Sequence, residues 1–230
     1  MSRAPRSLPD WEQIDTVFLD MDGTLLDLRF DNYFWRELVP QRYAERNGMT
    51  TRQAQRQLIP RFAAWEGRLE WYCLDHWTRE LGLDLAELEK EVAERIAFLP
   101  SAREFLVGLR PLGKRTVLVT NAHRTALALK VERTGLADHL DGQYSSHDFG
   151  LPKEEPAFWE RLRDHDGFDP GRTLLVDDSL PVLRAARTFG LRHLYGMERP
   201  DTGAPARVAV EFEAVDSLLD LLARDSARSS

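Results

Sequence analysis

Two carboxylates stand two residues apart immediately after a short apolar run near the start of the chain. The run at 16–19, TVFL, leads into Asp20 and Asp22, and a glycine, Gly23, follows. Burying an unpaired carboxylate costs on the order of several kcal/mol, so a strand that ends in two of them needs a partner close by. We expect that partner to be a cation, a proton or a phosphate group.

The other polar residues that could share this chemistry follow later apolar runs or lie between them. They are Thr120, Asn121, Lys153, Asp177 and Asp178. Carboxylates can hold a hard cation, a hydroxyl and an ammonium group can bind phosphate oxygens, and one carboxylate is left to attack phosphorus. Mg²⁺ is normally bound by a few carboxylates together with phosphate and water. The residue types therefore indicate Mg²⁺-dependent chemistry on a phosphate ester.

The elements that must position these residues are short strands alternating with helices. Apolar, β-branched runs at 16–20, 115–120, 172–178 and, more weakly, 191–196 predict strands, and helix-like stretches at 102–113 and 156–166 lie between them. This alternation is typical of an α/β fold in which helices cover both faces of a parallel sheet. The carboxyl ends of parallel strands meet at one edge, so we expect the polar residues to converge there.

One long segment departs from this alternation. Residues 28–98 contain amphipathic helical stretches and no strand-like run, which predicts an all-helical insert after the first strand. The α/β core then consists of 14–27 and 99–223. We expect disordered tails at 1–10 and 224–230.

Composition limits the partners of the chain. Its 230 residues, 43% of them hydrophobic and 30% charged, suit one or two globular domains, and the net charge of -7 argues against a nucleic-acid polymer or an anionic membrane as partner. One cysteine, Cys73, permits no intrachain disulfide. The first residues lack the apolar run of a signal peptide, and no stretch approaches the ~20 apolar residues of a membrane span. We expect a cytoplasmic protein with a small-molecule partner.

Four motifs, in order, resemble the haloacid dehalogenase (HAD) superfamily of phosphohydrolases. They are DMDGT (20–24), LVTNA (118–122), PKEEP (152–156) and LLVDDS (174–179), and the resemblance covers about 14–198. It implies a HAD-like Rossmannoid core with a parallel sheet and an inserted helical cap of the C1 type.

The resemblance also implies roles for the two aspartates of the first motif. Asp20 is the expected nucleophile, which forms an aspartyl-phosphate. Asp22 is the expected general acid, which protonates the leaving oxygen and then activates water as a base. Relatives that displace halide carry no acid at the position of Asp22, so its presence favours cleavage of a P–O bond.

The remaining motif residues would bind metal and phosphate. Asp20, the backbone carbonyl of Asp22, and Asp178 would hold Mg²⁺, with Asp177 assisting directly or through water. The expected phosphate-binding residues are Thr120, Asn121, Lys153 and Gly23. Gly23 is included because glycine permits a tight turn beside the substrate. Many relatives carry a further acid four residues after the metal-binding aspartate, where this chain has Val182; the pair of adjacent aspartates replaces it.

The helical insert is rich in aromatic residues, and in this family such an insert sets specificity. Segments of the insert and of the core resemble a bacterial branch of the family described as GMP/IMP 5'-nucleotidases. They are FDNYFWRELVP and EGRLEWYCLDHW in the insert and TNAHRTALALKVERTGLADHLD in the core. Aromatic faces stack on purine bases. The substrate-contact candidates are Trp35, Glu66, Trp71, Tyr72 and His123. Asn121 and His123 have an equally good alternative role as caps of the next helix.

Other functions remain open from the sequence. They are a phosphatase of another small phosphate ester, such as a sugar phosphate or phosphoglycolate; a phosphomutase or phosphotransferase; and a non-catalytic phosphate-binding interaction protein. Cys73 and His76 have the spacing of half a metal site, but no second pair follows, so we expect them to serve packing.

Overall fold

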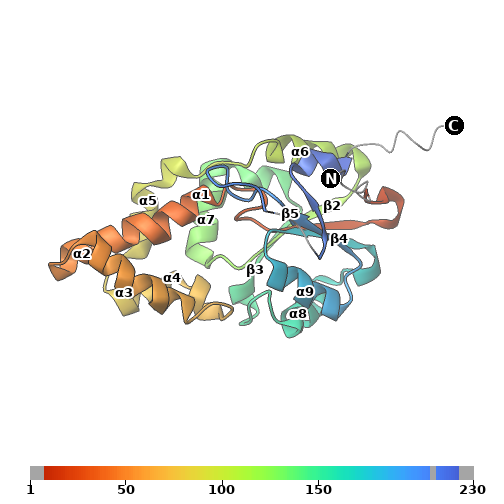
Figure 1. Cartoon of the computed structure of the whole chain (residues 1–230). Coiled ribbons are helices and arrows are strands. Elements are labelled where there is room, and N and C mark those ends of the chain that lie inside the picture. Colours follow the sequence, from red (N-terminus) through yellow and green to blue (C-terminus); the bar gives the residue numbers. More distant parts are fainter. Residues whose placement is uncertain (1–7, 208–210, 223–230) are drawn as a thin grey trace.

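A six-stranded parallel sheet forms the centre of the computed structural model, which describes residues 8–207 and 211–222 (Figure 1). Its strands lie in the order β3-β2-β1-β4-β5-β6. Their bounds are β1 Thr16–Leu19, β2 Arg115–Thr120, β3 Gly142–Ser145, β4 Thr173–Asp177, β5 His193–Met197 and β6 Glu213–Val215. The predicted α/β class with a parallel sheet is confirmed.

Helices cover both faces of this sheet (Figure 1). The alternating side chains of β1 show why: Val17 and Leu19 pack into one apolar cluster, and Phe18 packs into the other. The first cluster includes residues of α6 Ala102–Leu109 and α7 Arg124–Thr134. The second includes residues of α8 Pro156–Asp166 and α9 Leu180–Phe189. Because both faces are buried, the strands read as continuous apolar runs.

A helical lobe stands beside the sheet, and it is built from the segment predicted to be all-helical (Figure 1). Its helices are α1 Arg29–Tyr33, a π-helical turn Phe34–Leu38, α2 Val39–Asn47, α3 Thr51–Ala63, α4 Leu74–Leu81 and α5 Leu85–Glu91. The lobe has an apolar core of its own, with Phe34, Leu58 and Trp77 fully buried at its centre.

The π-turn has a local cause. Pro40 lacks a backbone N–H and cannot donate to the carbonyl of Arg36. The side chain of Gln55 on α3 donates to that carbonyl instead, at 3.0 Å. This hydrogen bond joins α3 to the π-helical turn Phe34–Leu38.

The stretch 69–82, which reads as one amphipathic helix, is interrupted in the structure. A 3-10 helix, Leu69–Tyr72, ends at Cys73, whose φ of -90° and ψ of 108° are extended, and α4 begins at the next residue. The interruption turns the residues at 71–73 toward the core.

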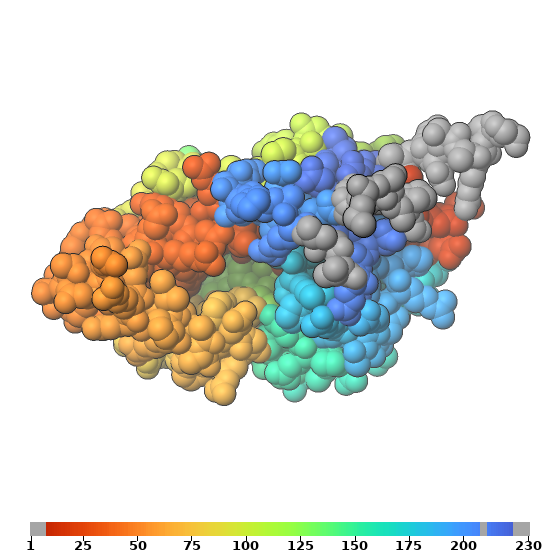
Figure 2. All heavy atoms as spheres, viewed as in Figure 1, coloured from red at the N-terminus to blue at the C-terminus, as the bar shows by residue number. Residues whose placement is uncertain are grey.

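In the space-filling view a recess separates the orange helical lobe from the cyan and blue part of the core (Figure 2). Among the described residues, no helix is long and apolar enough to cross a membrane. The predicted tails lie outside the described residues except for 8–10, where Asp10 caps a short 3-10 helix, Trp11–Gln13.

Candidate active site

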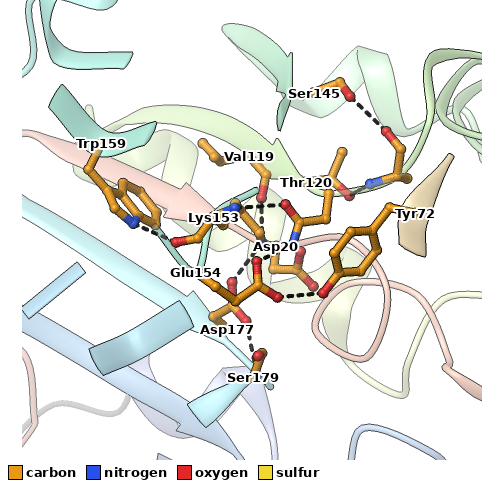
Figure 3. Close-up of polar contacts among 12 residues, drawn as sticks. Asp20, Tyr72, Val119, Thr120, Ser145, Lys153, Glu154, Trp159, Asp177 and Ser179 are labelled. Atoms are coloured by element: carbon orange, nitrogen blue, oxygen red, sulfur yellow. Dashed lines mark hydrogen bonds and ion pairs between the residues drawn. The ribbon is translucent and has the colours of Figure 1, made fainter. Parts of the chain in front are cut away.

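Lys153 is the centre of a buried polar cluster at the carboxyl edge of the sheet (Figure 3). Its ammonium group donates to Asp20 Oδ1 at 2.5 Å, to Asp177 Oδ2 at 2.7 Å and to the carbonyl of Val119 at 2.9 Å. Three acceptors use all three of its protons. The backbone carbonyl of Lys153 accepts a bond from Trp159 Nε1 at 2.9 Å, which fixes the loop that carries it.

Three carboxylates surround a point beside Lys153. Asp20, Asp177 and Asp178 each offer an oxygen, and these atoms lie within 4.8 Å of one another. Burial raises the pKa of each carboxyl, neighbouring carboxylates add to the rise, and Lys153 opposes it. The single positive charge of Lys153 does not balance the negative charge of three carboxylates. A divalent cation that prefers oxygen ligands therefore fits the site.

The two adjacent aspartates differ in how their oxygens are occupied. Asp177 accepts from Lys153 through one oxygen and from the Ser179 backbone N–H, at 2.9 Å, through the other. Among the described residues, the Asp178 carboxylate has only the guanidinium of Arg207 as a partner, 3.3 Å away. The Asp178 carboxylate is therefore the one with oxygens to spare for a metal.

Gly23 lies against this acidic group. Its φ is +91°, and a Cβ built there would come within 2.7 Å of Asp178 Cγ. A side chain at position 23 would strain the turn and displace that carboxylate, so the turn requires glycine.

Asp22 lies apart from Lys153 and has a different counter-ion. Lys130, buried on α7, places Nζ 2.8 Å from Asp22 and 2.7 Å from Asp31 on α1. Glu89 on α5 is 2% exposed beside them, and its Oε2 has no hydrogen-bond partner. Burial lowers the pKa of Lys130, but the three acids outweigh that effect and raise it. No motif pointed to Lys130, Asp31 or Glu89.

Thr120 and Asn121 follow β2 directly. Thr120 is 1% exposed, and its hydroxyl accepts from the backbone N–H of Ala122 at 3.0 Å. Asn121 accepts from the backbone N–H of Lys153 and donates to Glu154 Oε2, both at 2.9 Å. Asn121 therefore holds two loops of the site together.

Tyr72 links the helical lobe to this network. Its hydroxyl donates to Glu154, the same carboxylate that Asn121 contacts (Figure 3). Burial and the charge of Glu154 raise the pKa of Tyr72, so its phenol remains a donor. Glu154 stood inside the third motif, but its own type gave no sign of this link.

Three cavities lie at or near the polar cluster, and Trp71 lines each of them. A catalytic cavity of about 210 Å³ is lined by the predicted catalytic residues, by the predicted phosphate-binding residues other than Gly23, and by Trp35, Trp71, Tyr72 and His123. A larger cavity of about 660 Å³ is lined by Glu66, Trp71, Tyr72, Asp178 and Arg207 among others. A third, of about 490 Å³, lies among aromatic residues of the lobe and includes Trp35 and Trp71.

The predicted substrate-contact residues therefore divide between these spaces. Trp71 lines all three cavities, whereas Glu66 lines only the largest of them. His123 lines the catalytic cavity and also caps α7, since its Nδ1 accepts from the Thr125 N–H at 3.4 Å. Trp35 packs edge-on against Phe62 and belongs partly to the core of the lobe.

Comparison with known proteins places this site in a family. The model of the haloacid dehalogenase-like hydrolases matches residues 14–190. The chain belongs to this family. It is 44% identical over 193 residues, 84% of this chain and 87% of the relative, to the GMP/IMP nucleotidase YrfG of Escherichia coli K12. Within the family it is therefore a phosphomonoester hydrolase.

More distant relatives agree with the fold. A phosphoglycolate phosphatase of Nitrosococcus oceani is 23% identical over 218 residues, 91% of this chain and 96% of the relative. Among solved structures, a HAD phosphatase from Thermococcus onnurineus superposes with a TM-score of 0.75 at 22% identity, covering 90% of this chain and 96% of that one.

Proposed function

We propose that the chain is a Mg²⁺-dependent nucleotidase that hydrolyses purine nucleoside 5'-monophosphates, GMP and IMP first among them. The observation that carries the substrate class is the 44% identity to the GMP/IMP nucleotidase, because it covers 84% of the chain, which is more than the core without the helical lobe could supply. The aromatic wall formed by Trp71 and Tyr72 beside the catalytic cavity supports it. We also propose that residues 28–98 act as the cap, and that the enzyme is cytoplasmic.

Asp20 is the proposed nucleophile. Its Oδ1 is held by Lys153, so its second oxygen is the one that can attack phosphorus. The attack forms an Asp20–phosphorus bond and breaks the bond from phosphorus to the nucleoside 5'-oxygen. Asp22 gives that oxygen a proton and afterwards takes one from the water that hydrolyses the aspartyl-phosphate.

The charges around Asp20 support the attack of an anion on an anion. Thr120 and the backbone at Gly23 would receive the phosphoryl oxygens, while Lys153, whose three protons are taken by Asp20, Asp177 and the Val119 carbonyl, would supply positive charge beside them. When bound, Mg²⁺ supplies the positive charge that the three carboxylates lack. Asp20, the backbone carbonyl of Asp22, and Asp178 would hold it, while Asp177, occupied by Lys153 and Ser179, would orient this set.

Phosphate release from a panel of substrates tests the proposal. We expect GMP or IMP to give the highest kcat/KM among nucleoside monophosphates, sugar phosphates and phosphoglycolate in the presence of Mg²⁺. Asp20→Asn should abolish the release. A preference for a sugar phosphate or phosphoglycolate would contradict the substrate class but not the chemistry, whereas turnover by Asp20→Asn would contradict the mechanism.

A further inference from the structure

A second set of metal-ligating side chains lies beside the catalytic cavity. Cys73, His123 and His147 each offer one ligand atom, and these three atoms lie within 4.8 Å of one another. The two histidines belong to the core: His123 precedes α7, and His147 lies in the 3-10 helix Ser146–Asp148 after β3. Cys73 belongs to the helical lobe. The proposed hydrolysis uses neither Cys73 nor His147.

The two imidazole rings are placed by the surrounding backbone. His123 Nδ1 accepts from the backbone N–H of Thr125, which leaves Nε2 for another partner. The rings of His123 and His147 meet edge to face, with centroids 5.0 Å apart at 85°. A metal-bound histidine usually donates its other ring N–H, so His123 Nε2 can bind a metal only when the weak 3.4 Å bond to Nδ1 is released and the ring proton moves to Nδ1.

A role in packing alone does not explain the environment of the His147 ring. Its Nε2 is buried and has no hydrogen-bond partner among the residues that the structure describes. Buried polar atoms without a partner are few in folded proteins, and a missing ion is one explanation for such an atom.

Cys73 lies where the sequence expected the middle of a helix. The chain is extended there, and the sulfur accepts a weak bond from the His76 backbone N–H at 3.4 Å, at the amino end of α4. The thiolate is the form of cysteine that binds a metal. Asp75, two residues further on, places Oδ2 3.7 Å from His123 Nε2 and offers an oxygen to the same group.

We propose that Cys73, His123 and His147 bind Zn²⁺, with Asp75 or water as the fourth ligand. Sulfur and imidazole ligands select zinc over magnesium, so this site and the carboxylate site take different ions. Tetrahedral ligands of zinc lie about 3.5 Å from one another, given metal–ligand bonds of about 2.0–2.3 Å. Small rotations of the three side chains bring the atoms from their present separation to that geometry.

The ion has a consequence for the enzyme because its ligands come from both the helical lobe and the core. Cys73 follows Trp71 and Tyr72 in the lobe, and His123 lines the catalytic cavity in the core. Zinc bound there ties the lobe to the core beside the cavity. We therefore expect micromolar Zn²⁺ to slow turnover, an effect that rests on the proposed function, whereas binding of the ion does not.

Binding of Co²⁺ in place of zinc tests the site in the full-length protein, with Mg²⁺ in excess. We expect one equivalent of Co²⁺ to give the visible bands of a tetrahedral site and a thiolate-to-cobalt charge-transfer band. Cys73→Ser should remove the charge-transfer band. His147→Gln should weaken Zn²⁺ binding, measured by calorimetry, by about tenfold or more. His165→Gln, a change at an exposed histidine outside the cluster, is the control and should bind zinc as the wild type does.

Two results would overturn the proposal. One is a cobalt spectrum without the thiolate band. The other is equal Zn²⁺ affinity in the wild type, Cys73→Ser and His147→Gln, which would place the ion at the carboxylates. Because neither readout needs turnover, they stand even if the chain hydrolyses no nucleotide. Inhibition is then read separately, as loss of Zn²⁺ sensitivity in Cys73→Ser.

Discussion

Lys130 Nζ lies 2.8 Å from the carboxylate of Asp22, the proposed acid and base of the reaction. The same ammonium group lies 2.7 Å from Asp31, which belongs to the helical lobe. One buried cation of the core thus contacts both the proposed catalytic Asp22 and the lobe. The position of the lobe and the environment of Asp22 are therefore coupled through Lys130, which acts as a positioning residue.

Replacing Lys130 by methionine should damage both stability and turnover. The change leaves Asp22 and Asp31 without their cation, and removal of one partner from a buried ion pair costs about 3–5 kcal/mol. We expect a loss of that size in the free energy of unfolding by urea and a fall in kcat for GMP. Adding Asp31→Asn should recover part of the lost stability. The control is Lys90→Met, at an exposed lysine paired with Glu87; equal effects of the two lysine variants would contradict this role.

Glu89 should make the protein less stable as the pH rises. Burial, with the nearby carboxylates of Asp31 and Asp22, raises its pKa from 4.5 to about 8, against the opposing effect of Lys130. Between these values the folded chain holds a proton that the unfolded chain has lost, so the free energy of unfolding falls as the pH rises through this window. Glu89→Gln keeps the shape without the charge.

The expected result is a variant whose unfolding free energy exceeds that of the wild type near pH 8, with little difference near pH 4.5. The exposed Glu87→Gln serves as the control and should leave the pH dependence unchanged. Urea titrations across this range measure both. A wild-type stability that does not change between these pH values would contradict burial of a protonated Glu89.

The strands that the sequence predicted are the ones whose both faces are buried. β1 and β4 lie at the centre of the sheet and are buried, and apolar residues fill most of their positions. The edge strands β3 and β6 had no such signal: GQYS and EAV are short and partly exposed, and they pair on one side only. An edge strand depends on its neighbour rather than on its own composition.

The sequence predicts the site residues that lie together in short motifs. It does not predict those that only the folded path of the chain brings together. The four motifs brought Asp20, Lys153 and Asp178 to attention together. Lys130 reads as one more lysine of an ordinary helix, because its partner Asp31 is 99 residues away. Sequence spacing pairs Cys73 with His76, three residues further on, whereas in the structure Cys73 lies beside His123 and His147. Local spacing carries no information about such contacts.

Magnesium should stabilise the folded chain through Asp178. We expect the three carboxylates of the folded chain to bind the ion and the unfolded chain not to bind it, so saturation at about 100 times the dissociation constant should add about 2.7 kcal/mol. We expect Mg²⁺ to raise Tm in the wild type, EDTA to reverse the rise, and Asp178→Asn to abolish most of it. Asp164→Asn, at an exposed aspartate, is the matched control. A Tm that rises equally in both variants would place the magnesium elsewhere.

Trp71 should contribute more to the binding of a purine nucleotide than to the chemistry. Its side chain lines all three cavities. A purine base that extends from the catalytic cavity into either of the other two therefore lies beside Trp71. Stacking of a base on an aromatic ring is worth about 1–3 kcal/mol, which corresponds to about 5–150-fold. Trp71→Ala should therefore raise KM for GMP by a factor in this range while kcat/KM for ribose 5-phosphate, which has no base, stays close to the wild-type value. Steady-state kinetics on both substrates measure the difference, and Trp71→Phe, which keeps a stacking face, should recover most of the lost affinity. Equal losses on both substrates would mean that Trp71 holds the lobe in place rather than the base.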